Sequence, residues 1–362
     1  MTIIYDTSAT TIPVPYTITS TDASNIIISQ PVSQTGYYMC NFFIEFNPDG
    51  NNADNTNYLS AFVCNTNDFN TASSNVNNWY NTVNIYPQYW GTRSCKSCYI
   101  STILYLVQGD TISGCFKAFQ NQQIISAYLQ FMIINIEVIV SNGLISGAIS
   151  NTIDGQPFSV FTTSSLTNGI YFFENYLSYS TNQQPYYVFS AISTTDPLTG
   201  GFNILNVNNT VNVYTSSTNQ TMIRGTHNSS IIDISNNNNV YGIGQTGANN
   251  QTLNAGWLNY YLFNNFSIIY TKNENFSPFI TINNSNPIDV LSYNISQTGV
   301  YYCEGGITYN INTTTNIPLY VCISDISATS SSFTIDSNYS TVNNIYTRAG
   351  SSETNFRGCR TT

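Results

Sequence analysis

Apolar residues occupy every second position along a stretch that begins at Gly36 and runs to Phe46. Every second residue from Tyr38 onward is apolar, so one face of the stretch is apolar throughout. A period of two is typical of a β-strand, and a glycine in front of the run is typical of a turn that leads into it. The pattern predicts a strand whose apolar face lies in a hydrophobic core.

The same stretch returns twice farther along the chain. Ser33–Cys40 reads SQTGYYMC, and Ser296–Cys303 reads SQTGVYYC. A weaker copy, Leu166–Phe173, reads LTNGIYFF and has phenylalanine where the other two have cysteine. The copies define units of about 115 to 130 residues, which is the length of a domain and not of a solenoid repeat.

Further segments keep the same order in every copy. They are Tyr58–Cys64, Pro185–Phe189 and Pro318–Cys322, followed by Thr82–Tyr86, Thr210–Tyr214 and Thr341–Tyr346. The first two copies also align without gaps over Ser101–Gly114 and Ser229–Gly242. We expect both copies to close on a matching strand, at Phe131–Ile134 and at Phe266–Ile269.

These matches divide the chain into an array of domains. We expect an extended N-terminal arm at residues 1–22, a first repeat at 23–140, a linker at 141–156, a second repeat at 157–272 and a third at 279–362. The arm either adds an edge strand to a sheet or reaches a neighbouring molecule. Measured against the first repeat, the third lacks its last strands, which would leave open sheet edges. Three explanations stay open: the natural chain continues, another subunit supplies those strands, or the segment is not a full sandwich.

A hairpin is predicted late in the first repeat, with strands at Tyr99–Val107 and Ile112–Phe116 around the turn Gln108–Thr111. Together with the early strand that follows a glycine, it resembles the jelly-roll domains of the tumour necrosis factor and complement globular-head superfamily. The resemblance covers nearly all of the first repeat, whereas Asn236–Asn239 replace the Gly-Asp turn in the second. It implies an all-β chain of tandem jelly-roll β-sandwiches, two complete and a third partial. Many short strands with Gly and Asn turns favour a β-sandwich independently.

Charge is sparse and negative. Only 7% of residues are charged, the formal net charge is −10, and the 8 Lys and Arg residues are scattered singly. Nucleic-acid binding needs clustered cations, so we expect no nucleic-acid partner. A surface of amides and hydroxyls stays hydrated over a wide pH range, which fits exposure to a harsh medium. A genome rich in A and T would explain much of the same composition.

Neither a membrane span nor a signal peptide is expected. The most apolar run, Ile124–Val140, is interrupted by Gln130 and Glu137, whereas a span needs about 20 apolar residues. Met1–Asp6 has no basic segment in front of an apolar one.

Two cysteine positions change together between the repeats. Cys40 and Cys64 correspond to Cys303 and Cys322 in the third repeat, and to two phenylalanines in the second. The joint exchange suggests that the two positions touch across neighbouring strands. We predict disulfides Cys40–Cys64 and Cys303–Cys322, each worth about 3 kcal/mol in the chain-entropy model, with buried free thiols as the alternative.

The other cysteines do not define a metal site. Cys95 and Cys98 have zinc spacing, but only Cys115 is available nearby as a third ligand and a structural zinc needs four. Cys95–Cys98 and Cys98–Cys115 bonds both stay open, Cys115 also fits a core position, and Cys359 has no evident partner. The Asn47–Asn57 loop holds acidic residues but no bidentate glutamate for calcium. We expect no metal and no cofactor.

Acceptor sites for N-linked sugars are confined to the C-terminal part of the chain. They are Asn208, Asn219, Asn228, Asn250, Asn265, Asn275, Asn283, Asn294, Asn312 and Asn338. Such motifs mark solvent-exposed positions when they are used. Their distribution predicts that the first repeat packs against other protein, while the second and third face solvent and carry glycans.

Catalysis finds little support in the sequence. His227 is the only histidine, and it aligns with Tyr99 at a strand position, which favours a surface or packing role. No nucleophile elbow, phosphate-binding loop or metalloprotease motif is present. Nothing singles out Glu137 and Glu174, or any other carboxylates, as a pair for glycoside cleavage. We therefore expect that the protein is not an enzyme.

The architecture as a whole resembles the vertex turret or spike proteins of icosahedral double-stranded DNA viruses, above all the turreted viruses of thermoacidophilic archaea. The resemblance rests on tandem jelly rolls, an N-terminal arm and disulfides without a secretory route. It implies a virion-surface protein, assembled in the host cytoplasm, that forms a homo-oligomer around a symmetry axis. A pentamer is favoured and a trimer is the alternative.

Under this interpretation the first repeat binds other capsid or penton base proteins, and the second and third meet a host-surface receptor or glycan. Tyr186, Tyr187, Tyr260 and Tyr261 are candidates to stack on sugars, with a core or subunit-interface role as the alternative. A cell-surface adhesin or carbohydrate-binding module is the second hypothesis, and it would be expected to carry a signal or an anchor.

Overall fold

The structure is a computed structural model that describes most of the first two repeats and parts of the third. The described residues are 4–7, 12–20, 23–47, 59–74, 82–85, 96–118, 120–142, 149–151, 157–163, 166–181, 186–199, 202, 209–215, 222–235, 239–246, 251–264, 288–299, 301–309, 317–324, 326–331, 343–347 and 357–361. Within these ranges the only helical segments are a 3-10 turn at Thr66–Asp68 and α1 at Phe69–Ser74. The described chain is all-β apart from them, as predicted.

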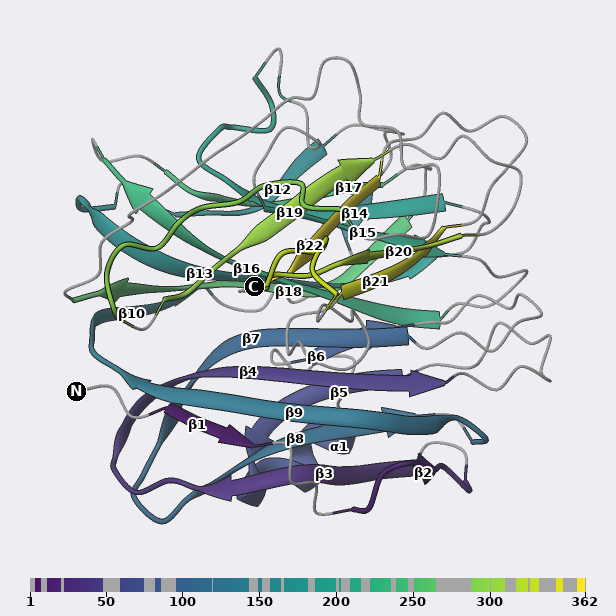
Figure 1. The fold of residues 1–362 in the computed structure, drawn as a ribbon. Coiled ribbons are helices and arrows are strands. Elements are labelled where there is room, and N and C mark those ends of the chain that lie inside the picture. The colour runs from purple at the N-terminus through teal and green to yellow at the C-terminus, as the bar shows by residue number, and fades with distance from the viewer. Residues whose placement is uncertain are drawn as a thin grey trace.

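The first repeat folds into two antiparallel sheets packed face to face, the lower half of Figure 1. One sheet joins β1 (Ile4–Thr7) and β2 (Tyr16–Thr17), both paired with β9 (Gln123–Ile134), to β4 (Gly36–Asn47) and β7 (Lys96–Leu106). The other has the order β3 (Ala23–Pro31), β8 (Thr111–Ala118), β5 (Leu59–Asn65) and β6 (Thr82–Ile85). We call this unit the first sandwich.

The second repeat has the same layout. Its first sheet joins β10 (Ile136–Asn142) and β11 (Ile149–Asn151), both paired with β18 (Gln251–Phe263), to β13 (Gly169–Thr181) and β16 (Met222–Ile234). Its other sheet has the order β12 (Pro157–Thr162), β17 (Tyr241–Thr246), β14 (Tyr186–Ser193) and β15 (Asn209–Thr215). We call this unit the second sandwich.

The strand order identifies both units as jelly rolls. If the split first strand of each sandwich counts as one, the eight strands fall into sheets of order 1-8-3-6 and 2-7-4-5. That arrangement of two Greek keys is the jelly roll, so the predicted fold class is confirmed for the first two repeats.

Two segments outside the predicted domains belong to the sandwiches. The predicted arm, residues 1–22, supplies β1 and β2, and the predicted linker, residues 141–156, contains the end of β10 and all of β11. The arm adds an edge strand, which was one of its two expected roles, whereas the linker contributes strands to the second sandwich. In both places the first strand of a jelly roll pairs with its last, so it lies far from its partner in the sequence. Asn135 alone separates β9 from β10, and the second sandwich begins there.

Irregularities in the sheets repeat from one sandwich to the other. The β3–β8 ladder shifts register between Ile26 and Ile28, and the β12–β17 ladder shifts between Ser159 and Phe161. The β4–β9 and β13–β18 ladders shift at a second pair of matching positions. Because bulges are retained features of a backbone and not accidents, their coincidence shows that one blueprint occurs twice.

Two of the sequence matches were out of register. Phe62 pairs with Thr82, and Ala191 pairs with Thr210, so β14 matches β5 four residues farther along than the sequence alignment placed it. In the last strand of the second sandwich, β18, Tyr260 takes the place of Phe131, and the predicted Phe266–Ile269 segment lies outside the described residues. Alternating strands allow such slips, because a shift by an even number of residues keeps the apolar face unchanged.

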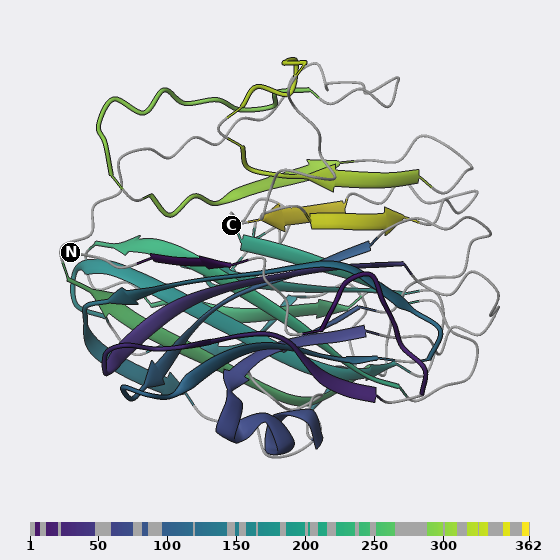
Figure 2. The same ribbon diagram turned by 60° about the horizontal axis from the view of Figure 1, so that its bottom comes forward.

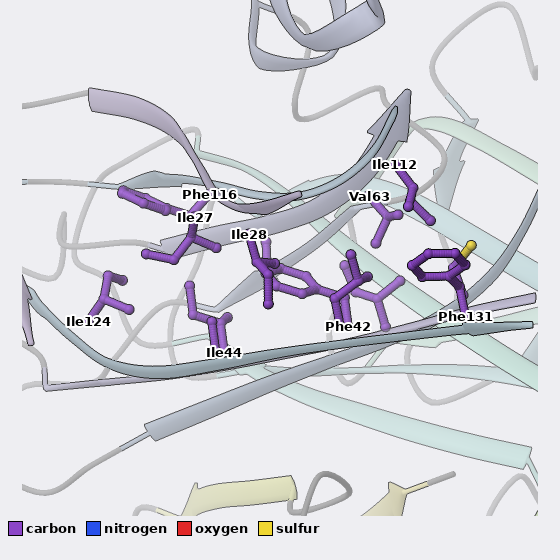
Figure 3. Packing of buried hydrophobic residues seen from close by; sticks show 14 of the residues in the cluster. Ile27, Ile28, Phe42, Ile44, Val63, Ile112, Phe116, Ile124 and Phe131 are labelled. Atoms are coloured by element: carbon purple, nitrogen blue, oxygen red, sulfur yellow. The ribbon is translucent and has the colours of Figure 1, made fainter. Parts of the chain in front are cut away.

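The core of the first sandwich draws on both of its sheets (Figure 3). Phe42 and Phe131 point inward from one sheet, and Ile28 and Phe116 point inward from the other. Gly114 on β8 lies so close to the Phe42 ring and to Ile28 that a Cβ atom would overlap both. The ring therefore fills the space that a side chain at position 114 would need.

Part of the third repeat forms two strand pairs, β19 (Gly305–Tyr309) with β22 (Arg357–Thr361) and β20 (Ile317–Val321) with β21 (Asn343–Thr347). In Figure 2 these pairs lie together on one side of the two sandwiches. The turn that precedes them repeats a hydrogen bond of the other units: Tyr301 donates to the Gln297 carbonyl at 2.6 Å, as Tyr38 does to the Gln34 carbonyl at 2.7 Å. This shared bond supports a third copy of the blueprint.

We predict that Gly114→Ala destabilises the protein by about 1 to 3 kcal/mol, because the added methyl group overpacks the core against Phe42. Denaturant unfolding of the full chain measures the change. Gly299→Ala is the matched control, since a Cβ there meets only ordinary contacts. Equal stability of the two variants would contradict the packing described for Gly114.

Candidate assembly and attachment surfaces

The two sandwiches pack against each other through the sheets that contain β4 and β13. Met39, Ile103 and Met132 from the first sandwich share one buried cluster with Phe172 and Tyr261 from the second. Figure 1 shows the second sandwich directly above the first. Each of these middle sheets is therefore covered on both faces, by its own sandwich core and by the other sandwich.

A polar row crosses the same interface two residues farther along the strands. On one side Asn41 lies opposite Ser101 and Gln130, and its amide donates to the Gln130 side chain. On the other side Glu174 lies opposite Ser229 and Asn259. Burial raises the pKa of the inward-facing Cys40 thiol well above its usual value, and the negative charge of Glu174 adds to the rise. Asn41 and Glu174 lie on the same strand faces as Met39 and Phe172, which share the buried cluster between the sandwiches.

Glu174 holds the single histidine of the chain. Its Oε1 is 3.2 Å from Nε2 of His227, and both side chains are 2% exposed. His227 was expected at the surface or in a packing role, and it is buried and paired with a carboxylate. Sequence alignment gave no sign of this pair. The residue directly opposite His227 on β13 is Tyr176, and Glu174 lies two residues away from Tyr176 on the same strand.

Several acceptors in the polar row have no hydrogen-bond donor among the residues that the structure describes. They are Oδ1 of Asn41, Oγ of Ser101, Oε2 of Glu174 and Oδ1 of Asn259. Burying such groups costs free energy, so this row does not exist for stability alone. A shift of one sheet along the other would bring the Glu174 charge against Met39 and Met132 of the first sandwich, which makes the polar row selective for one alignment of the two sheets.

The predicted Cys40–Cys64 disulfide is not formed. Cys40 points from β4 into the core of the first sandwich, whereas Cys64 points out of the opposite sheet, toward α1. The Sγ atom of Cys64 lies 3.8 Å from that of Cys115, and all three are free thiols. The predicted pairing failed because of the register slip between β5 and β14: the structural counterpart of Cys64 is Ser193, not Phe189.

The remaining cysteines give a mixed picture. Cys303 is exposed and Cys322 is partly buried, and both are free thiols, so the second predicted disulfide is not formed either. Cys98, on β7, lies opposite Ile44 of β4. Cys359, on β22, lies opposite Ile307 of β19. Cys95 and nearly all of the Asn47–Asn57 loop lie outside the described residues. Within the described part, no group of three His, Cys, Asp or Glu side chains comes together to hold a metal ion.

The sugar-acceptor sites divide into one buried, one exposed and eight untested positions. Asn228 is 2% exposed, and its amide donates to the Ser190 carbonyl at 3.4 Å, so it is closed to glycosylation in the folded chain. Asn294 is exposed. Outside the described residues lie Asn208, Asn219, Asn250, Asn265, Asn275, Asn283, Asn312 and Asn338.

Two of the four aromatic candidates for sugar stacking are inside the protein. Tyr260 belongs to the core of the second sandwich, and Tyr261 belongs to the buried cluster between the sandwiches. The other two, Tyr186 and Tyr187, lie on β14, where only the backbone is described. The alternative role, in a core or an interface, is the correct one for the first pair.

The third repeat is attached to the interface between the sandwiches. Glu304 accepts hydrogen bonds from the Ile231 backbone at 2.9 Å and from the Ser230 hydroxyl at 3.1 Å, both on β16. The Tyr302 ring meets Phe172 edge to face, with ring centres 6.1 Å apart. Among the described residues no helix is long and apolar enough to cross a membrane.

Comparison with known proteins gives loose structural likenesses alone. No family model and no curated protein matches the chain. The T=1 Penaeus vannamei nodavirus structure is 10% identical over 68% of this chain and 98% of its own, with a TM-score of 0.19. The STIV MCP structure is 9% identical over 73% and 97%, with a TM-score of 0.26. A peptide-N(4)-(N-acetyl-β-D-glucosaminyl) asparagine amidase is 12% identical over 74% and 98%, also at 0.26. Likeness at this level carries no argument about function, and the fold assignment rests on strand order.

We predict that Glu174→Ala destabilises the full chain by about 3 to 5 kcal/mol, because it leaves His227 buried without its partner. The double variant Glu174→Leu with His227→Leu should lose less than the single variant, since it removes both polar groups. Denaturant unfolding measures both, with Asp68→Asn on the exposed 3-10 turn as a neutral control. A single variant as stable as the control would contradict the pairing.

Proposed function

We propose that this protein is a structural component of a virion, forming a vertex turret or spike on an icosahedral capsid and contacting the host surface. The observation that carries the proposal is the pair of jelly rolls joined in one chain, with a single residue between them and a shared buried interface. Jelly rolls recur in capsid shells because the sandwich offers flat sides and loop-bearing ends for assembly. The step from this fold to a virion is an analogy at the level of architecture.

Other features support a building block over a catalyst. Within the described residues, the buried Glu174–His227 pair is enclosed between the sandwiches. Sparse charge gives the outer surface an amide and hydroxyl character that depends little on pH. In this proposal the protein acts as a homo-oligomer around a symmetry axis, a pentamer before a trimer. The first sandwich binds other capsid or penton base proteins, and the parts beyond it face the host receptor or glycan.

The proposal is tested by locating the protein in an infected culture. We expect an antibody against the full chain to detect it in gradient-purified particles and to label their vertices in electron micrographs. A control antibody against a host envelope protein should label membranes alone. Detection in the cell-envelope fraction and absence from purified particles would instead support an adhesin or a carbohydrate-binding module, and would overturn the virion assignment.

A further inference from the structure

The described part of the third repeat reproduces half of a jelly roll. Ile307 on β19 lies opposite Cys359 on β22, as Ile44 on β4 lies opposite Cys98 on β7. The pair β20–β21 takes the place of β5–β6 in the same way. These strands correspond to the third to the sixth strands of the first sandwich, which form one pair in each of its two sheets.

Two strand edges of this half are open in the described structure. In the first sandwich β4 lies between β7 and β9, and β5 lies between β6 and β8. In the third repeat, among the described residues, β19 pairs only with β22, and β20 pairs only with β21. Open edges of this kind carry unpaired backbone N–H and C=O groups that accept another strand.

The same repeat displays a segment with the pattern of a strand but without a sheet. Residues 288–299 belong to no ladder, and Leu291 and Ile295 are 44% and 53% exposed. If Gly299 is aligned with Gly36, these two residues correspond to Ile28 and Val32, which are 0% and 3% exposed in the first sandwich. Side chains that the blueprint places in a core are therefore presented to solvent.

The segment is fixed at both ends. Asp289 accepts hydrogen bonds from the Ala328 backbone at 2.7 Å and from the Ser327 hydroxyl at 2.5 Å. At the other end, Tyr301 bonds the Gln297 carbonyl, and Glu304 bonds β16. A segment held in this way loses little further entropy when it binds, which favours association.

We propose that residues 288–295 of one copy of this chain add as a strand to the open edge of β20 in a neighbouring copy. The added strand would take the place beside β20 that β8 has beside β5, and would bury Leu291 and Ile295. Backbone hydrogen bonds would supply the pairing and the two aliphatic side chains the specificity. Because donor and acceptor differ, the contact is head to tail and can close a ring. The inference rests on the oligomeric part of the proposed function.

The mass of the purified full-length protein in solution tests this strand addition directly. We expect light scattering after size exclusion to show a closed oligomer for the natural sequence and a monomer for Leu291→Asp with Ile295→Asp. Leu198→Asp is the matched control, because Leu198 is also exposed, at 78%, on a loop of the second sandwich. It should leave the oligomer intact. Circular dichroism should be the same for all three proteins, so that loss of the oligomer is not loss of the fold.

Hydrogen exchange gives a second readout that does not depend on the variants. Backbone amides in residues 289–295 should exchange more slowly at concentrations where the oligomer forms than at high dilution. A monomeric natural chain, or a double variant that forms an oligomer of the same mass as the natural chain, would overturn the proposed strand addition. An oligomer that survives the double variant would leave the virion proposal standing. An oligomer in a protein absent from particles would overturn the virion proposal alone.

Discussion

The structure depends on the packing of two middle sheets against each other. Burial of Met39, Ile103 and Met132 against Phe172 and Tyr261 closes an apolar face that each sandwich would otherwise expose. Nonpolar burial of this kind is the main force that holds domains together. Since only Asn135 separates the last strand of one sandwich from the first strand of the next, the chain leaves little freedom for any other arrangement.

The polar row beside this apolar patch has a different role. The Glu174–His227 pair and its buried acceptors contribute little net stability, because removing charges from water costs about as much as their attraction returns. Their effect is on alignment, since sliding one middle sheet past the other would place the Glu174 carboxylate against the apolar Met39 cluster of the first sandwich. The third repeat is attached to the same region through Glu304 and Tyr302, so the interface also determines where the chain continues.

Much of the fold was predictable from the sequence because apolar residues recur at every second position of its strands. The alternation from Gly36 to Phe46, and its return at Gly169, gave the strand type and the repeat. Alternation does not define register, however, so β14 was displaced by four residues and the cysteine pairing with it. The partners of the first strands could not be predicted, because the strands that pair with β1 and β10 lie more than 100 residues away in the sequence.

The interface was beyond the reach of sequence reasoning. Strands that are apolar on both faces, such as β4 with Met39 outward and Cys40 inward, do not reveal which face meets another domain. His227 and Glu174 come from different strands, and their contact follows from sheet order, which local patterns do not specify. The burial of Asn228 has the same origin. A sugar-acceptor motif is recognised from three residues of sequence, whereas the exposure of its asparagine depends on the fold.

Calorimetric melting of the Phe172→Ala variant tests the central claim most directly. Phe172 belongs to the second sandwich, yet its ring fills the cluster that joins it to the first. If the two sandwiches form one cooperative unit, the truncation lowers the melting temperature of both together, in a single transition. Two separate transitions, of which only one responds to the substitution, would contradict the account.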